Sequence, residues 1–180
     1  MGIESIPDLL RHVTLLTLAV VCAYTDLARR RLYDRATLTG IAAGLCLNAA
    51  AGGVGYPGMT TGPGLAGSLA ALGCGGLVFL WFFLRGGVTG GDVKYVCAVC
   101  SIGGLEHFFA LRALFLSSLV GGAMALALMI QKGVMLPGIL KALKFTVQPA
   151  SKGGPGSLAI PYGLAVSLGT LWAWLLVYVL

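Results

Sequence analysis

Long runs of apolar residues dominate this chain, and short segments rich in Gly, Pro or basic residues separate them. A helix of roughly 20 apolar residues crosses the hydrocarbon core of a bilayer. Of the 180 residues, 58% are hydrophobic and only 10% are charged, and the mean hydropathy is +0.93. These values exclude an ordinary soluble domain. We therefore expect a single all-α, polytopic integral-membrane domain over residues 1–180, with about six transmembrane helices in the lipid bilayer.

The apolar runs set the expected spans. We expect them at about 10–26, 36–51, 65–84, 92–103, 110–130 and 158–180. Residues 52–64 are rich in Gly and Pro, which predicts a loop. A short interfacial helix is compatible with residues 139–144, because lysines stand at the edge of an apolar helical face there. Asp34 is placed to cap the second span. The N-terminal residues lack the basic start of a cleavable signal, so the first span is expected to remain as an anchor.

The basic residues predict the orientation of the spans. With six spans, ten of the twelve Lys and Arg residues fall on one side, and that side faces the cytoplasm. The ten are Arg29, Arg30, Arg31, Arg35, Arg85, Lys94, Lys132, Lys141, Lys144 and Lys152, against Arg11 and Arg112 on the other side. Both termini are then on the outer side. The net charge of +6 is explained by topology and anionic lipid, so no nucleic-acid partner is expected.

A carboxylate, Asp92, stands at the start of the fourth apolar run. Ionisable groups at the depth of a membrane are functional candidates that normally have a partner. This run reaches Gly103 after only about eleven residues, roughly half a bilayer. Either the helix continues through the glycines toward Phe109, or Asp92 lies below the membrane surface in a protein-lined recess. The candidate partner is Asp26, which ends the first span at the same boundary.

Two neighbouring carboxylates share a proton, and such a pair performs aspartic protease chemistry. One activates a water while the other polarises a peptide carbonyl. Gly90 and Gly91 leave the backbone open to a substrate strand. Because the dipole of the fourth helix favours an anion at its start, we expect Asp92 to be ionised and Asp26 protonated. Taken singly, Asp92 is also compatible with a helix cap and Asp26 with an ion pair to Arg29 or Arg30.

The five cysteines, Cys22, Cys46, Cys74, Cys97 and Cys100, all lie within apolar runs. Cys97 and Cys100 form a CxxC pair, but no His or loop spacing accompanies it as in a zinc site. Helix packing is the favoured interpretation for all five, over redox or metal chemistry. No metal and no other cofactor is expected.

The ordered motifs resemble those of the type IV prepilin peptidases, membrane aspartic proteases of the GxGD class. The resemblance rests on Asp26 before a basic stretch, on TGGDVK at 89–94 and on IPYGLAVSLG at 160–169. The lack of a cysteine-rich extension is similar to the short form that serves tight-adherence (Flp-type) pili. The chain departs from the pattern at the first glycine of GxGD, which is Thr89 here, and after Asp26, where Leu32, Tyr33 and Asp34 replace an Ile-Pro-Asn-like element.

This resemblance implies a function and a set of site residues. It implies a multi-pass protein of the bacterial inner membrane that removes the leader peptide of prepilins or pseudopilins at the cytoplasmic face. By position, Asp26 and Asp92 match the catalytic aspartates. The residues that support the site or bind substrate would be Gly90, Gly91, Lys94, Pro161, Tyr162 and Gly163. The chain has no room for a methylating domain, so we expect peptidase activity alone. The oligomeric state and the particular prepilin are not predicted.

Two other classes of function are compatible with the same residues. A small transporter or a proton or ion channel would use Asp26 and Asp92 as a relay. Such a relay needs polar groups across the whole membrane, and the second, third, fifth and sixth expected spans contain no Asp, Glu, Lys or His. A non-catalytic scaffold would tolerate substitution of both aspartates.

Overall fold

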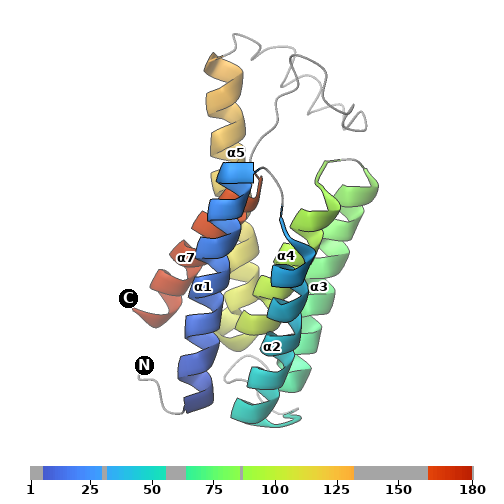
Figure 1. Ribbon diagram of the computed structural model, residues 1–180, viewed down its shortest axis with the longest axis vertical. Coiled ribbons are helices and arrows are strands. Elements are labelled where there is room, and N and C mark those ends of the chain that lie inside the picture. Colours follow the sequence, from blue (N-terminus) through green and yellow to red (C-terminus); the bar gives the residue numbers. More distant parts are fainter. Residues whose placement is uncertain (1–5, 30–31, 56–63, 86, 132–161, 180) are drawn as a thin grey trace.

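The computed structural model describes residues 6–29, 32–55, 64–85, 87–131 and 162–179, and these ranges are helical with no strand. The helices are α1 (Ile6–Arg29), α2 (Asp34–Gly52), α3 (Leu65–Leu84), α4 (Gly90–Gly103), η1 (Glu106–Phe108), α5 (Phe109–Gln131) and α7 (Tyr162–Tyr178) (Figure 1). Each expected span corresponds to a helix. The expected interfacial helix at 139–144, most of the expected loop at 52–64 and Pro161 lie outside the described residues.

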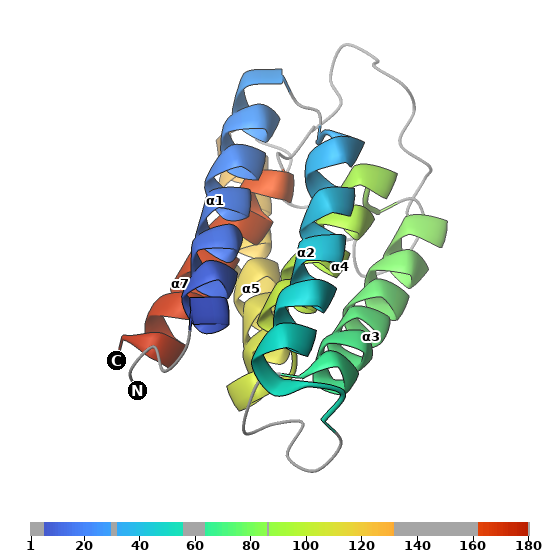
Figure 2. The ribbon, with the colours of Figure 1, turned by 60° about the horizontal axis from the view of Figure 1, so that its bottom comes forward.

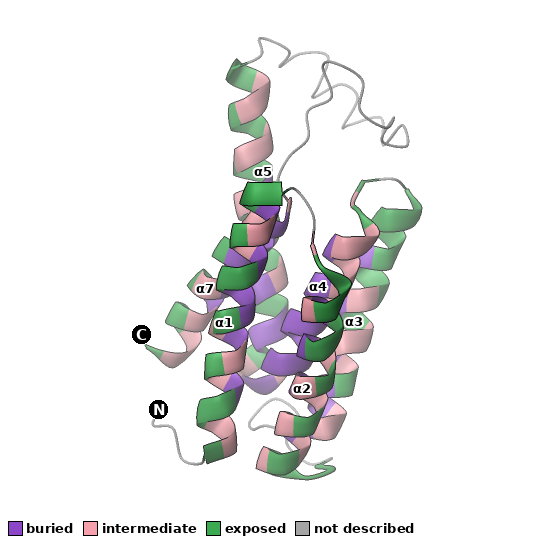
Figure 3. Ribbon diagram, viewed as in Figure 1, coloured by how far each residue is buried: buried purple, intermediate pink, exposed green. Residues whose placement is uncertain are grey.

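Helix α4 is the centre of the bundle. It packs mainly against α2 and α3 and also contacts α1, α5 and α7. On the other side α5 packs along α7, and α7 along α1 (Figure 2). Helix α1 packs equally along α2, so it joins the group of α5 and α7 to the group of α2, α3 and α4. Nine of the 14 residues of α4 are buried, more densely than in any neighbour (Figure 3). A residue on α4 is therefore shielded by helices from both groups.

Helix α4 ends inside the bundle at Gly103, and the chain turns at Gly104 with φ 63°. The open carbonyl groups of its last turn find partners on other helices. The Asn48 Nδ2 amide donates to the carbonyl oxygens of Ser101 at 3.0 Å and Ile102 at 2.9 Å, and the Ser68 hydroxyl also donates to Ser101. Irregular backbone within a membrane protein requires such internal partners. The helix therefore does not continue through the glycines, which excludes the first of the two alternatives for this segment.

A buried ion pair stabilises the end of the bundle at which α1 begins and α4 ends. Arg11 is only 3% exposed, and its guanidinium lies 2.5 Å from the Glu106 carboxylate. The same guanidinium donates to Asn48 Oδ1 at 3.1 Å. Buried charges require such pairing, because an isolated one is strongly disfavoured away from water. The cluster joins α1, α2 and η1.

Three helical segments of the described chain are long and apolar enough to cross a membrane: Ile6–Arg29, Leu65–Leu84 and Glu106–Gln131. Helix α7 is a shorter apolar helix of 17 residues. The protein is thus an all-helical membrane protein with three candidate spans. Six spans and their orientation remain predictions from the sequence.

Candidate active site

Asp26 continues the buried stripe of α1. Leu15, Leu18, Cys22 and Asp26 are all buried and recur every three or four residues, the spacing of one helix face. Asp26 is 7% exposed, and its Oδ2 accepts a hydrogen bond of 2.9 Å from the backbone N–H of Leu164. A helix N terminus has free N–H groups of this kind. The carboxylate is therefore fixed against the first turn of α7.

The glycine at position 163 makes this approach possible. A Cβ atom on Gly163 would lie 2.9 Å from Asp26 Oδ2, 3.0 Å from its Cγ and 3.1 Å from its Cβ. These distances are shorter than ordinary van der Waals contacts. Gly163 thus lies directly against the Asp26 carboxylate. Its neighbour Tyr162 packs edge-to-face on Phe79, with 5.9 Å between ring centroids.

Asp92 is held by a capping box at the start of α4. Thr89 is the N-cap, and Asp92 Oδ2 accepts its backbone N–H at 2.9 Å and its hydroxyl at 2.8 Å. In return the Asp92 N–H donates to Thr89 Oγ1 at 3.4 Å. This reciprocal arrangement satisfies free donors of the first turn. Asp92 therefore has the capping role considered for it, although as the third helical residue and not as the cap itself.

The structure brings Asp26 and Asp92 to one end of the bundle, since α1 ends and α4 begins there (Figure 1). Both are buried, and their carboxylates interact electrostatically. Tyr162 also interacts electrostatically with Asp92. Three segments that are far apart in the sequence thus contribute to one site. The hydrogen bonds that hold both carboxylates run to Oδ2.

The expectation that Asp92 is ionised and Asp26 protonated relied on a helix start at Asp92 alone. Asp26, like Asp92, is held by a helix N terminus, so the helix ends provide no such asymmetry. The Arg29 guanidinium contacts the hydroxyl and the ring of Tyr33 and, among the described residues, forms no ion pair with Asp26.

Lys94 pairs with Asp34, with 2.8 Å between Nζ and Oδ2. Asp34 was expected to cap α2, and this expectation is wrong. The N-cap is Tyr33, which makes no side-chain capping bond, and Asp34 is already the first helical residue. The pair joins the starts of α2 and α4. Both side chains are well exposed, so its contribution to stability is small.

The two glycines before Asp92 are in contact with other side chains. A Cβ on Gly91 would lie 3.3 Å from Leu32 Cβ, and one on Gly90 would lie 3.7 Å from the Phe83 ring. We expected this backbone to be open to a substrate strand. The side chain of Leu32 occupies that position at Gly91, so close packing is a direct reason for this glycine.

Sequence reasoning missed several residues that hold the site. Thr89 was noted only as a departure from a glycine, although the T-x-x-D spacing is a capping-box signal. Tyr95 lies one turn after Asp92 and its hydroxyl is 2.8 Å from the Ser167 hydroxyl. No local pattern predicts that contact, because the two residues meet only through the packing of α4 on α7. The Arg11–Glu106 pair was missed for the same reason.

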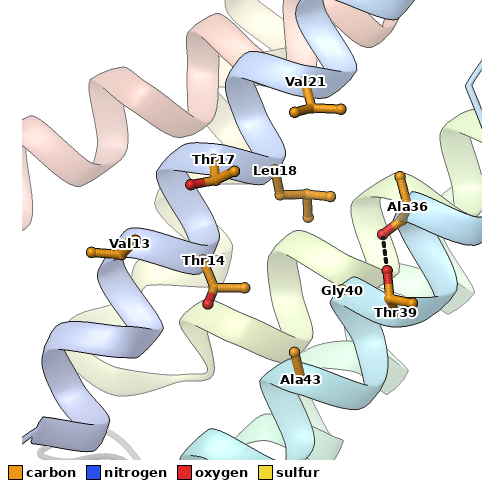
Figure 4. A pocket seen from close by; sticks show the side chains of 9 residues that line it. All are labelled: Val13, Thr14, Thr17, Leu18, Val21, Ala36, Thr39, Gly40 and Ala43. Carbon is orange, nitrogen blue, oxygen red and sulfur yellow. Dashed lines mark hydrogen bonds between the residues drawn. The ribbon is translucent and has the colours of Figure 1, made fainter.

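A hollow of about 410 Å³ lies between α1 and α2. Five residues of α1 and four of α2 line it (Figure 4): Val13, Thr14, Thr17, Leu18 and Val21, and Ala36, Thr39, Gly40 and Ala43. Its lining contains no ionisable group and neither aspartate, so this hollow is separate from the candidate active site. Two of its threonines, Thr14 and Thr39, turn their hydroxyls to carbonyls of their own helices.

The described residues include no group of three or more His, Cys, Asp or Glu side chains arranged to hold a metal ion. The five cysteines are free thiols, of which Cys22 and Cys100 are buried in the bundle. Buried Cys100 lies against Gly75, whose missing side chain leaves room for its sulfur. Helix packing accounts for this thiol.

Comparison with known proteins gave one finding. A family model described as the type IV leader peptidase family matches residues 13–126. The matched segment includes Asp26 and Asp92 and ends before α7. The chain matches no curated protein and no solved structure.

Proposed function

The chain belongs to the type IV leader peptidase family, and we propose that it is an aspartic endopeptidase that removes the leader of Flp-like type IV prepilins. It would act at the cytoplasmic face of the bacterial inner membrane as one domain over residues 1–180. The observation that carries the proposal is the pair of buried carboxylates, Asp26 and Asp92, that interact at one end of the bundle. Paired carboxylates in a shielded position are typical of active sites.

The proposed reaction uses one water and one shared proton. The ionised carboxylate takes a proton from the water while the water oxygen bonds to the carbonyl carbon of the scissile peptide. The protonated carboxyl donates its proton to the carbonyl oxygen. As the tetrahedral intermediate collapses, the C–N bond breaks and the first carboxyl protonates the leaving nitrogen. The second carboxylate takes back a proton from a hydroxyl of the intermediate, so the pair regains its shared proton. The leader gains a new carboxyl terminus and the pilin a new amino terminus.

The hydrogen bonds at the site support different roles for the two oxygens of each carboxylate. Leu164 holds Asp26 by Oδ2, and Thr89 holds Asp92 by Oδ2. We assign the other oxygen, Oδ1, of each residue to the water and the substrate carbonyl. A fixed carboxylate stays in reacting geometry without reorganisation, which is a large part of enzymatic rate enhancement. Gly163 forms the wall beside Asp26.

The test of the proposal is leader removal in co-expression with Flp-like prepilins. We expect Asp26→Asn and Asp92→Asn each to leave the precursor uncleaved while the enzyme still inserts in the membrane. Asp34→Asn is the matched control, since it changes a carboxylate near the same end that pairs only with Lys94 in the described structure. Substantial cleavage by either of the first two variants would refute the dyad.

We also propose six spans with both termini on the outer side. In a cysteine-free background, a cysteine at exposed Arg35 should react with an impermeant reagent only from the cytoplasmic side. A cysteine at exposed Arg112 should react only from the outside. The opposite labelling pattern would separate the aspartates from a cytoplasmic leader.

A further inference from the structure

A buried chain of hydrogen bonds leads from α4 to the carboxylate of Asp26. The Tyr95 and Ser167 hydroxyl oxygens are 2.8 Å apart, and the Ser167 hydroxyl donates to the Gly163 carbonyl oxygen at 2.9 Å. A hydroxyl has one proton to donate. Because Ser167 gives its proton to Gly163, Tyr95 must be the donor to Ser167. The direction of the first bond is thereby fixed.

The chain of hydrogen bonds continues through a single peptide group. The Gly163 carbonyl and the Leu164 N–H are the two ends of the same amide, and that N–H donates to Asp26 Oδ2 at 2.9 Å. A donor at the carbonyl end of an amide strengthens the hydrogen bond made by its N–H. All three bonds therefore point the same way, from Tyr95 through Ser167 and the amide to Asp26.

The surroundings make this chain effective. Tyr95 and Ser167 are both 0% exposed, so no solvent competes for their hydroxyls. Hydrogen bonds are electrostatically stronger in such an interior than in water. Tyr95 lies three residues after Asp92, on the same face of α4. One helix thus carries Asp92 directly and reaches Asp26 on α1 through α7.

We propose that Tyr95 and Ser167 are positioning residues that hold Asp26 in register with Asp92, an inference that rests on the proposed peptidase function. They act through the Gly163–Leu164 amide and do not contact the substrate. A purely structural role is the alternative, because a serine hydroxyl bonded to the carbonyl four residues earlier is common within helices. The experiment has to separate the two roles.

The first measurement is the steady-state kinetics of leader removal by purified enzyme in detergent. We expect Tyr95→Phe and Ser167→Ala each to lower kcat by about five- to tenfold, with KM within about twofold of the parent. The double variant should be about as slow as either single variant, since each breaks the same chain. An unchanged kcat, or an effect on KM alone, would overturn the proposal.

The protein contains matched control residues for both substitutions, Tyr95→Phe and Ser167→Ala. Ser118 makes the same kind of bond, to the Leu114 carbonyl at 2.9 Å, on an exposed part of α5. Tyr178 is a partly buried tyrosine at the opposite end of α7. Ser118→Ala and Tyr178→Phe should keep the parent kcat. Equal losses in the controls would show a general packing effect and would also overturn the proposal.

The second measurement does not depend on cleavage. In protein labelled with ¹⁵N-leucine, the Leu164 amide is identified by its loss in Leu164→Met. Its proton resonance should move to lower frequency in Tyr95→Phe, because its bond to Asp26 weakens, and should stay in place in Tyr178→Phe. An unmoved resonance would refute the proposed role of Tyr95 and Ser167 even if the enzyme cleaves prepilin. If the parent enzyme cleaves no prepilin, the proposed peptidase function is refuted instead. The Leu164 resonance still tests whether Tyr95 strengthens the hydrogen bond to Asp26.

Discussion

Adding a single methyl group at Gly163 tests how tightly the Asp26 carboxylate is positioned. The new Cβ would meet three atoms of Asp26 at 2.9, 3.0 and 3.1 Å. Ordinary contacts between such atoms are about 3.5–4.0 Å. The Asp26 side chain or the start of α7 must therefore move by roughly half an ångström or more to restore contact at that separation. Asp26 is 7% exposed, so it has little free space into which to move.

The expected consequence is a loss of activity with little loss of stability. Misplacement of a reacting group by about 1 Å costs on the order of 100-fold in rate. We therefore expect Gly163→Ala to lower kcat/KM for leader removal by roughly 30- to 100-fold. Alanine is favoured over glycine within a helix by about 1 kcal/mol, which offsets part of the strain. The assay is cleavage of purified prepilin, with thermal unfolding in detergent measured on the same samples.

The matched control is Gly122→Ala on α5. A Cβ at Gly122 has no atom within 4 Å, so the same substitution adds helix propensity without a clash. The Gly122→Ala enzyme should cleave prepilin at the parent rate. If Gly163→Ala also cleaves within about twofold of the parent, the fixed geometry inferred for Asp26 is wrong. A collapse of thermal stability in Gly163→Ala would mean that the strain is absorbed by the fold and not by the carboxylate.

Three further predictions test the supports around the site. Thr89→Val should lower kcat/KM by roughly tenfold in the cleavage assay, because it removes the hydroxyl that holds Asp92, and Thr89→Ser should retain activity. Glu106→Gln should lower the free energy of unfolding in detergent by about 3 kcal/mol, because it leaves the buried Arg11 without its nearest counter-charge, and an unchanged unfolding midpoint would contradict this. Asp34→Asn should cost less than about 1 kcal/mol in the same unfolding measurement, since its pair with Lys94 is exposed, and a severe loss of cleavage would show a second role for this carboxylate.

Several features could be predicted from the sequence because they depend on local chemistry. Apolar runs of bilayer length predict membrane helices in any context, and the third expected span, 65–84, coincides with α3. Glycines and charges mark the ends of the runs. The position of Asp92 at a helix start also follows from its neighbours, since the T-x-x-D spacing closes a capping box within three residues. The family, too, could be predicted from the sequence, and the family model that matches residues 13–126 confirms it.

Other features were decided only by the packing of helices that are distant in the sequence. Asp26 finds its donor at Leu164, and Tyr95 finds Ser167, because α7 lies beside both α1 and α4. Helix α4 can end at Gly103 because the side-chain amide of Asn48 on α2 donates hydrogen bonds to the open carbonyl groups of its last turn. The sequence names polar residues on apolar helices and indicates that each needs a partner. Which partner it meets depends on the rotation and register of whole helices, and these are set by the fit of many small and apolar side chains together.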